Sequence, residues 1–189
     1  TNMSLELYIG PMYAGKTTKL IRMFQENKSS QKVVIDFSFK HHKTIQIADL
    51  KNHNDVKLPN VYTTQNLSVL VNESSYENQD FEYYSKFSTT KYIYINECQF
   101  FPDLKYNVLS WIKKGIHVYL YGLDADYKME LFGQTTLLIP YCNHIEKLKG
   151  ICSICKNPSI VSYRTTSDTC VFLPNAEYIP LCLKCRDSM

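Results

Sequence analysis

Short apolar runs recur along the first 150 residues, and polar stretches rich in turn-forming residues separate them. Four of these runs contain mainly β-branched, aromatic and leucine side chains, a composition typical of buried strands. They span residues 5–9, 32–39, 91–96 and 116–121. A shorter run at residues 137–139 predicts a fifth strand.

Two other segments place apolar residues at the spacing of one helix face. The first spans residues 17–27, where Leu, Ile, Met and Phe side chains share a face. The second begins at Pro102-Asp103 and runs to about residue 114. Gly115 suits its end, because glycine tolerates the left-handed conformation just past a helix C-terminus. This alternation of strands and helices predicts an α/β fold with a parallel sheet.

Two polar segments interrupt this alternation. Residues 40–60 are rich in His, Lys and Asn, which predicts a mobile loop. Residues 72–90 show no helical period and predict an irregular surface insertion. After Gly150 the pattern changes to paired cysteines beside short β-like runs. We therefore expect an α/β domain at residues 1–150 and a small second domain at residues 151–189.

The composition is that of a chain able to bury a core, because hydrophobic residues make up 44% and charged residues 21% of it. A formal net charge of +3 is too small to predict a nucleic-acid partner, which requires a clustered basic face. No apolar run approaches the ~20 residues that span a bilayer. The first residues lack the pattern of a secretory signal. We expect neither nucleic acid nor a membrane as a partner.

A glycine-rich motif lies between the first predicted strand and the first predicted helix. Residues 10–17, GPMYAGKT, match the pattern G-x-x-x-x-G-K-[ST]. Its glycines let backbone N–H groups face phosphate oxygens, and the helix adds its positive N-terminal end. Lys16 would reach the β- and γ-phosphates and the Thr17 hydroxyl would bind Mg²⁺. A chance turn is the alternative, which the flanking strand and helix disfavour.

Polar side chains follow two predicted strands at their C-terminal ends, where open α/β sheets place their ligands. Asn96 and Glu97 follow the third strand, and Asp124 follows the fourth. Glu97 is a candidate general base, and Asp124 is a second candidate. Asn96 stands where phosphate-loop enzymes usually carry the Asp of the magnesium shell. A solvated carboxylate at a strand end is the alternative for both acids.

The chain has seven cysteines, an odd number that a full set of disulfides cannot account for. Four form two Cys-x-x-Cys pairs separated by 26 residues, namely Cys152, Cys155, Cys182 and Cys185. Pairs at this spacing predict a tetrahedral Zn²⁺ site that is structural, because four thiolates leave no position for a water. Free thiolates also favour a reducing compartment, so we expect a cytoplasmic protein.

Three motifs together resemble the type II thymidine kinases, the family of the human cytosolic and poxvirus enzymes. They are GPMYAGKTTKL at residues 10–20, NECQFFPD at residues 96–103, and the spaced cysteine pairs. The resemblance implies a RecA-like P-loop α/β domain, a small zinc-binding lasso domain and a homotetramer. It also implies transfer of the ATP γ-phosphoryl group to the 5′-hydroxyl of thymidine, with Mg²⁺ as cofactor and dTTP as feedback inhibitor.

The same resemblance implies roles for individual residues. Glu97 falls at the catalytic base, Thr17 and Asn96 at the magnesium position, and the four paired cysteines at the zinc ligands. The implied ATP-binding residues are Gly10, Pro11, Met12, Tyr13, Ala14, Gly15, Lys16, Thr17, Thr18, His41, His42, Lys43, Asn96 and Gln99. The implied nucleoside-binding residues are Met12, Phe100, Leu123, Tyr127, Thr169, Cys170, Val171, Phe172, Leu173 and Tyr178.

Two departures from the family pattern keep a second function open. Asn96 replaces an Asp, and residues 40–43 replace a Lys-Asp-x-Arg segment, so that Lys43 keeps a charge without the bidentate fork of Arg. A degenerate kinase that senses dTTP or ATP without turnover is therefore the alternative. A zinc-bearing ATPase acting on single-stranded nucleic acid is a third reading, which the modest charge disfavours.

Overall fold

A mostly parallel sheet forms the centre of the computed structural model, which describes residues 4–76, 81–167 and 177–189. Within these residues the sheet has seven strands in the order β3-β4-β2-β5-β6-β1-β7. The strands are β1 Ser4–Ile9, β2 Lys32–Phe37, β3 Gln46–Lys51, β4 Lys57–Thr64, β5 Tyr92–Ile95, β6 His117–Gly122 and β7 His144–Lys147. All neighbouring pairs are parallel except β3 and β4. The expected α/β class is confirmed.

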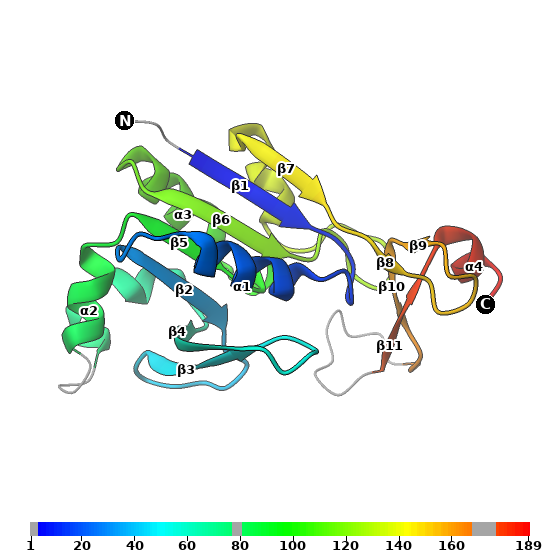
Figure 1. Cartoon of the computed structure of the whole chain (residues 1–189), viewed down its shortest axis with the longest axis horizontal. Helices are drawn as coiled ribbons and strands as arrows, with labels where there is room; N and C mark the ends of the chain where they lie inside the picture. Colours follow the sequence, from blue (N-terminus) through cyan, green and yellow to red (C-terminus); the bar gives the residue numbers. More distant parts are fainter. Residues whose placement is uncertain (1–3, 77–80, 168–176) are drawn as a thin grey trace.

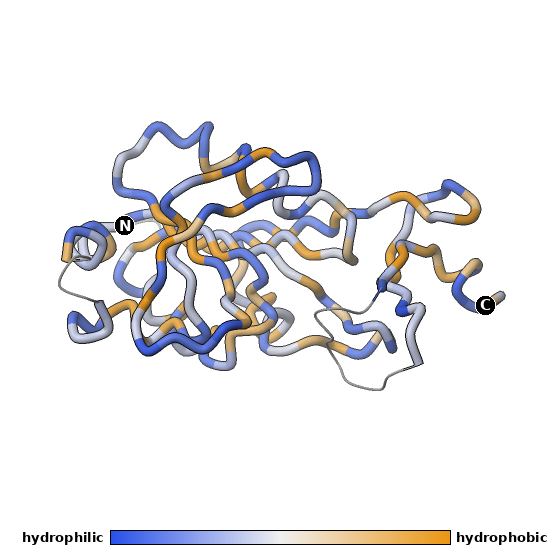
Figure 2. Tube along the Cα trace, turned by 90° about the horizontal axis from the view of Figure 1, so that it is seen from below, coloured by the Kyte–Doolittle hydropathy of each residue, from blue (hydrophilic) through white to orange (hydrophobic). Residues whose placement is uncertain are grey.

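Helices cover both faces of this sheet, with α1 in front of it and α3 behind it in Figure 1. Alternate residues of β2 supply both cores: Val33 and Ile35 pack on the α3 face, and Val34 packs on the α1 face. Figure 2 shows polar residues mainly along the outer loops. The helices are α1 Lys16–Glu26, α2 Phe81–Ser88, α3 Leu104–Lys113 and α4 Leu183–Asp187; shorter 3₁₀ turns are η1 Leu67–Val71, η2 Glu73–Ser75, η3 Cys98–Phe100 and η4 Thr135–Tyr141.

Three sequence predictions were wrong. The predicted loop at residues 40–60 contains β3 and the start of β4, where Leu50 and Leu58 are the buried hydrophobic strand residues, so the segment lacks the apolar run of a buried strand. The predicted irregular insertion contains α2, a helix too short to show a clear period, with Phe87 as its buried residue. The predicted fifth strand is part of η4, and β7 takes the sheet edge instead.

Small strands and one helix make up the C-terminal part, which projects from one end of the sheet in Figure 1. Here β8 Gly150–Ile151 pairs with β9 Pro158–Ser159, and β10 Val161–Arg164 pairs with β11 Tyr178–Leu181, both antiparallel. Val161 and Leu181 pack with two of the paired cysteines in a separate apolar cluster. In the described part of the chain, every helix is too short or too polar to cross a membrane.

Candidate active site

The glycine-rich loop leaves the C-terminal end of β1 and leads directly into α1. Gly15, the residue before the helix, has φ 82°, a left-handed conformation that suits glycine. Gly10 has φ 152°, and a Cβ there would lie 2.4 Å from the Leu148 carbonyl oxygen. Gly15, at the N-cap position, has no side chain to cap the start of α1, and the first turn of the helix carries no acidic residue. Its first N–H groups are therefore available to an anion.

Lys16 is held inside this loop. Its Nζ donates hydrogen bonds to the carbonyl oxygens of Gly10 at 3.0 Å and Pro11 at 2.6 Å. Burial lowers the pKa of the Lys16 ammonium group, and the nearby negative charges of Glu97 and Asp124 act in the opposite direction. The loop thus places a buried cationic group opposite acidic side chains.

A cavity of about 290 Å³ opens beside the loop. Its lining residues are Met12, Tyr13, Ala14, Gly15, Lys16, Thr17, Thr18, Phe39, Asn52, His53, Glu97 and Leu123. The structure therefore brings most of the predicted phosphate loop to one cavity with Glu97. The cavity is also lined by Phe39, Asn52 and His53, which no sequence motif contains. Phe39 lies two residues after β2, and Asn52 and His53 lie in the turn between β3 and β4.

Contacts between the β3–β4 turn and the loop close one side of the cavity. The Asn52 amide Nδ2 donates to the Thr18 hydroxyl at 3.1 Å. The rings of Tyr13 and His53 lie 5.1 Å apart between centroids. These residues are far apart in the sequence, so only the antiparallel pairing of β3 with β4 reveals that they meet.

Glu97 follows β5 in a left-handed conformation with φ 54°, which is uncommon for a residue with a side chain. Its carboxylate accepts a hydrogen bond from the Gln99 amide Nε2 at 2.8 Å. The Gln99 Oε1 in turn accepts from the Leu123 backbone N–H at 3.0 Å. Gln99 is buried and does not line the cavity; it ties the Glu97 carboxylate to the end of β6.

Asn96 lies between the loop and a carboxylate that the sequence reasoning missed. Its Oδ1 lies 3.5 Å from the Thr17 hydroxyl, and its Nδ2 donates to Asp36 Oδ1 at 3.0 Å. The pKa of Asp36 is raised to about 6: burial is the largest cause, the hydrogen bond from Asn96 acts in the opposite direction, and the negative charge of Glu97 adds to the rise. The oxygens of Thr17 and Asn96 are the kind of donor that Mg²⁺ prefers, so they fit that ion.

Other predicted site residues lie elsewhere. Asp124, the second candidate acid, forms an ion pair with Lys147 at 2.9 Å and does not line the cavity. His41, His42 and Lys43 line a separate hollow of about 300 Å³ between residues 38–45 and 63–66. The structure does not bring these three side chains to the cavity that contains Glu97.

A smaller hollow adjoins the cavity through Met12 and Leu123, which line both. Tyr127 and Tyr178, two predicted nucleoside-binding residues, also line it, whereas Phe100 packs against Phe39 and Phe132. The predicted Thr169, Cys170, Val171, Phe172 and Leu173 fall outside the described residues.

Arg164 holds these two tyrosines together, and no sequence pattern pointed to it. Its guanidinium lies over the Tyr127 ring at 3.9 Å from the centroid. Its Nη2 donates to the Tyr178 hydroxyl at 2.6 Å. The Met12 backbone N–H donates to Ser162 Oγ at 2.9 Å, so β10 contacts the glycine-rich loop directly.

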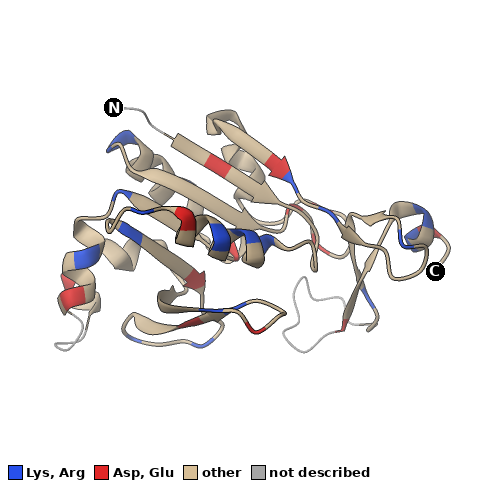
Figure 3. Ribbon diagram, viewed as in Figure 1, with Lys and Arg blue, Asp and Glu red and all other residues tan. Residues whose placement is uncertain are grey.

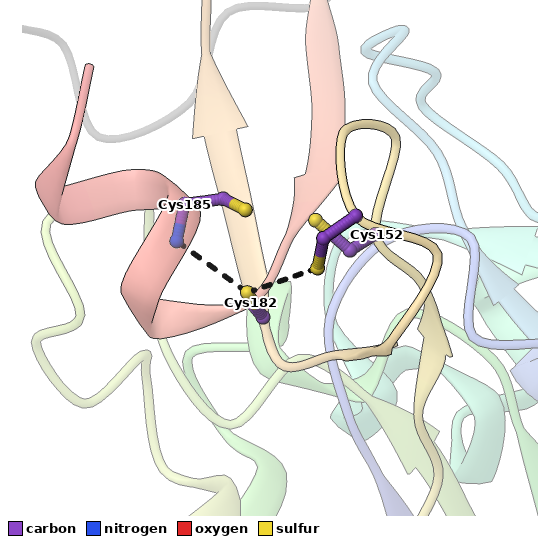
Figure 4. Close-up of side chains that lie close together, drawn as sticks. Cys152, Cys182 and Cys185 are labelled. Carbon is purple, nitrogen blue, oxygen red and sulfur yellow. Dashed lines mark hydrogen bonds between the residues drawn. The ribbon is translucent and has the colours of Figure 1, made fainter.

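The four paired cysteines form one cluster, as the sequence predicts. Figure 4 labels three of them, Cys152, Cys182 and Cys185. Their sulfur atoms lie within 4.8 Å of one another, and the Sγ atoms of Cys155 and Cys182 are 3.6 Å apart. A tetrahedral zinc with Zn–S bonds of ~2.3 Å would separate its sulfur ligands by ~3.8 Å. The cluster could therefore hold a metal ion such as zinc.

The fold and the loop define a class: a mostly parallel α/β protein whose first strand and helix flank a glycine-rich motif of the phosphate-binding pattern. The model of the thymidine kinase family matches residues 3–186. The chain therefore belongs to the thymidine kinase family, which confirms the resemblance seen in the sequence motifs.

Relatives from two insect poxviruses and one bacterium agree with this assignment. The thymidine kinase of Amsacta moorei entomopoxvirus is 31% identical over 98% of this chain and 99% of the relative. That of Choristoneura biennis entomopoxvirus is 30% identical over 97% and 96%. The thymidine kinase of Mycoplasma genitalium is 28% identical over 91% of this chain and 77% of the relative.

Proposed function

We propose that this chain is a kinase that transfers the γ-phosphoryl group of ATP to the 5′-hydroxyl of thymidine. The observation that carries the proposal is the shared cavity: the Glu97 carboxylate lines the same space as Lys16, Thr17 and the rest of the glycine-rich loop. Membership of the thymidine kinase family and the names of the relatives support the choice of substrates.

On the nucleotide side, the loop residues 10–18 bind the phosphates of ATP through backbone N–H groups, the start of α1 and Lys16. Thr17 and Asn96 are the residues that would hold Mg²⁺. Bound with ATP, this ion neutralises charge on the β- and γ-phosphate oxygens. Lys16 leaves its two carbonyl partners in the loop for the phosphates, which offer it a full negative charge.

On the acceptor side, Glu97 takes the proton of the 5′-hydroxyl as that oxygen bonds to the γ-phosphorus and ADP leaves. The loop and Lys16 stabilise the charge that spreads over the transferring group. Most of the catalysis in this scheme comes from positioning. The hydrogen bond from Gln99 holds the carboxylate in place for the proton transfer.

The nucleoside would lie against Met12, Leu123, Tyr127 and Tyr178, under the segment between the two cysteine pairs. Cys152, Cys155, Cys182 and Cys185 would hold a structural zinc that would anchor both ends of that segment, and the segment would help to exclude water from the substrate. Residues 151–189 then form the lasso domain. Feedback inhibition by dTTP and a homotetramer, both implied by the family resemblance, complete the proposal.

Initial rates with each of the four deoxynucleosides, ATP and Mg²⁺ test this function. We expect selective turnover of thymidine, and Glu97→Gln should lower turnover by roughly 10²-fold or more while ATP binding survives. Glu82→Gln, an exposed carboxylate on α2, is the matched control and should keep the rate. Binding of dTTP without turnover of any nucleoside would refute the enzyme and favour the sensor.

The nucleic-acid reading gains no support from the charge distribution. Figure 3 shows Lys and Arg interspersed with Asp and Glu across the described residues in this view. A protein that follows a nucleic-acid backbone needs a continuous positive groove. We therefore retain the kinase as the proposed function.

A further inference from the structure

Asp36 and Asn96 lie at the C-terminal ends of two neighbouring strands: Asp36 is the second-last residue of β2, and Asn96 directly follows β5. Strands β2 and β5 are adjacent and parallel (Figure 1). Ile95, the last residue of β5, pairs with Ile35 of β2. The residues that follow this pair are Asp36, still within β2, and Asn96, directly after β5. Their side chains meet in the 3.0 Å hydrogen bond from Asn96 Nδ2 to Asp36 Oδ1.

This hydrogen bond selects one orientation of the Asn96 amide. An ionised carboxylate only accepts hydrogen bonds, so it pairs with the NH₂ group of the amide and leaves the amide oxygen on the opposite side. On that side lies the Thr17 hydroxyl, 3.5 Å from the amide oxygen. A cation between Thr17 and Asn96 therefore meets an oxygen. In the reversed orientation it would meet the two N–H donors of the NH₂ group.

We propose that Asp36 is a positioning residue for the metal site: it holds the Asn96 amide so that its oxygen faces Thr17, and it supplies from β2 the negative charge that Asn96 lacks on β5. The inference rests on the proposed function, in which Thr17 and Asn96 hold Mg²⁺. The Asp36 carboxylate and the Asn96 amide, at the ends of adjacent strands, then together supply the negative charge and the oxygen ligand that a single Asp after β5 would supply.

Metal affinity separates this role from a purely structural one. In Asp36→Asn the two neighbouring amides can hydrogen-bond in either direction, so the orientation of Asn96 is no longer selected and the charge is lost. Removing a partner that orients a metal ligand typically weakens metal binding by about 10- to 100-fold. The affinity for ADP in the presence of a chelator should stay within about twofold of wild type, because the loop itself is unchanged.

The double variant Asp36→Asn/Asn96→Asp exchanges the two groups. The new amide at position 36 donates to the new carboxylate at position 96, so the hydrogen bond is kept and the charge moves next to Thr17. We expect the double variant to bind metal at least as tightly as wild type. Tighter metal binding by the double variant than by Asp36→Asn would show that the two residues act as a coupled pair.

The affinity for metal is measured by electron paramagnetic resonance of Mn²⁺ in the ADP complex of the full chain, a readout that does not depend on activity. Mn²⁺ is a suitable probe because it favours the same oxygen ligands as Mg²⁺. Asp49→Asn, which removes an exposed carboxylate from β3, is the matched control and should change nothing. If Asp36→Asn does not fold, the double variant against wild type decides the question, since weaker binding there overturns the proposal.

Two further outcomes overturn the inference in distinguishable ways. If the wild-type ADP complex binds no Mn²⁺, the proposed metal site itself fails, and the role of Asp36 falls with it. If wild type binds Mn²⁺ and Asp36→Asn binds it within about twofold, the metal site stands and only the positioning role is refuted.

Discussion

Replacing Gln99 with methionine tests how the Glu97 carboxylate is held. Methionine has a similar length and flexibility but no amide, so it fills the space and removes both hydrogen bonds of the Gln99 side chain. Those bonds join Glu97 at 2.8 Å and the Leu123 N–H at 3.0 Å. One is a charge-assisted bond to the proposed base, and the other satisfies a buried backbone donor.

The two losses should appear in different measurements. The Leu123 residue is 5% exposed, so its N–H loses a partner that water cannot replace, at a cost of about 1–3 kcal/mol in the free energy of unfolding. Glu97 is half-buried and faces the cavity, so water can hydrate it after the substitution. The substitution therefore affects the position of the Glu97 carboxylate. A hydrogen bond to a charged group contributes about 1.5–3 kcal/mol, and losing that much from the stabilisation of the transition state lowers kcat roughly 10- to 100-fold.

Gln134→Met is the matched control. Gln134 also uses both ends of its amide, since Oε1 accepts from the Lys105 N–H at 2.9 Å and Nε2 donates to the Pro102 carbonyl at 2.8 Å. It does not contact Glu97, so it should lower stability alone. Urea unfolding and steady-state rates on both variants separate the effects. A Gln99→Met protein that turns over at the wild-type rate would refute the positioning of Glu97 by Gln99.

Two other substitutions address the C-terminal part of the chain. Cys155→Ala should lower the zinc content below the expected value of about one ion per chain and lower the melting temperature, because metal binding contributes directly to folding. Elemental analysis and thermal melts measure both effects, and Cys142→Ala, which lies outside the cluster, is the control. An unchanged zinc content in Cys155→Ala would contradict the prediction. Arg164→Lys should raise the KM for thymidine about tenfold and leave that for ATP unchanged, because Lys loses the planar contact with Tyr127 and the fork toward Tyr178. Arg22→Lys on the exposed face of α1 is its control, and equal shifts in both KM values would contradict the assignment.

The parallel core was predictable because its signals are local. Strands β1, β2, β5 and β6 are nearly continuous apolar runs, as expected for strands buried on both faces. The glycine motif and the cysteine pairs have fixed spacings that carry their own chemistry. By contrast, β3 and β7 lie at the sheet edges, and Leu50 is the one residue of these two strands that is buried, so their sequences do not resemble buried strands.

The parts of the site that the sequence did not predict are those made by strand order. Asp36 is the second-last residue of β2 and looks like an ordinary polar residue near a strand end until β2 is placed beside β5. The same holds for Asn52 and His53, which reach the glycine-rich loop only because β3 and β4 form an antiparallel pair.

Strand order also changes the meaning of Asn96. Taken alone, an Asn where related sites carry an Asp suggests a weakened metal position, which is one of the two departures that support a sensor without turnover. Placed beside Asp36, the same residue is half of a hydrogen-bonded pair that contains both the oxygen and the negative charge a Mg²⁺ ion requires. Under the proposed role of Asp36, the two strands share a function that related sites assign to one Asp, and the hypothesis of a degenerate enzyme keeps only the departure at residues 40–43 as support.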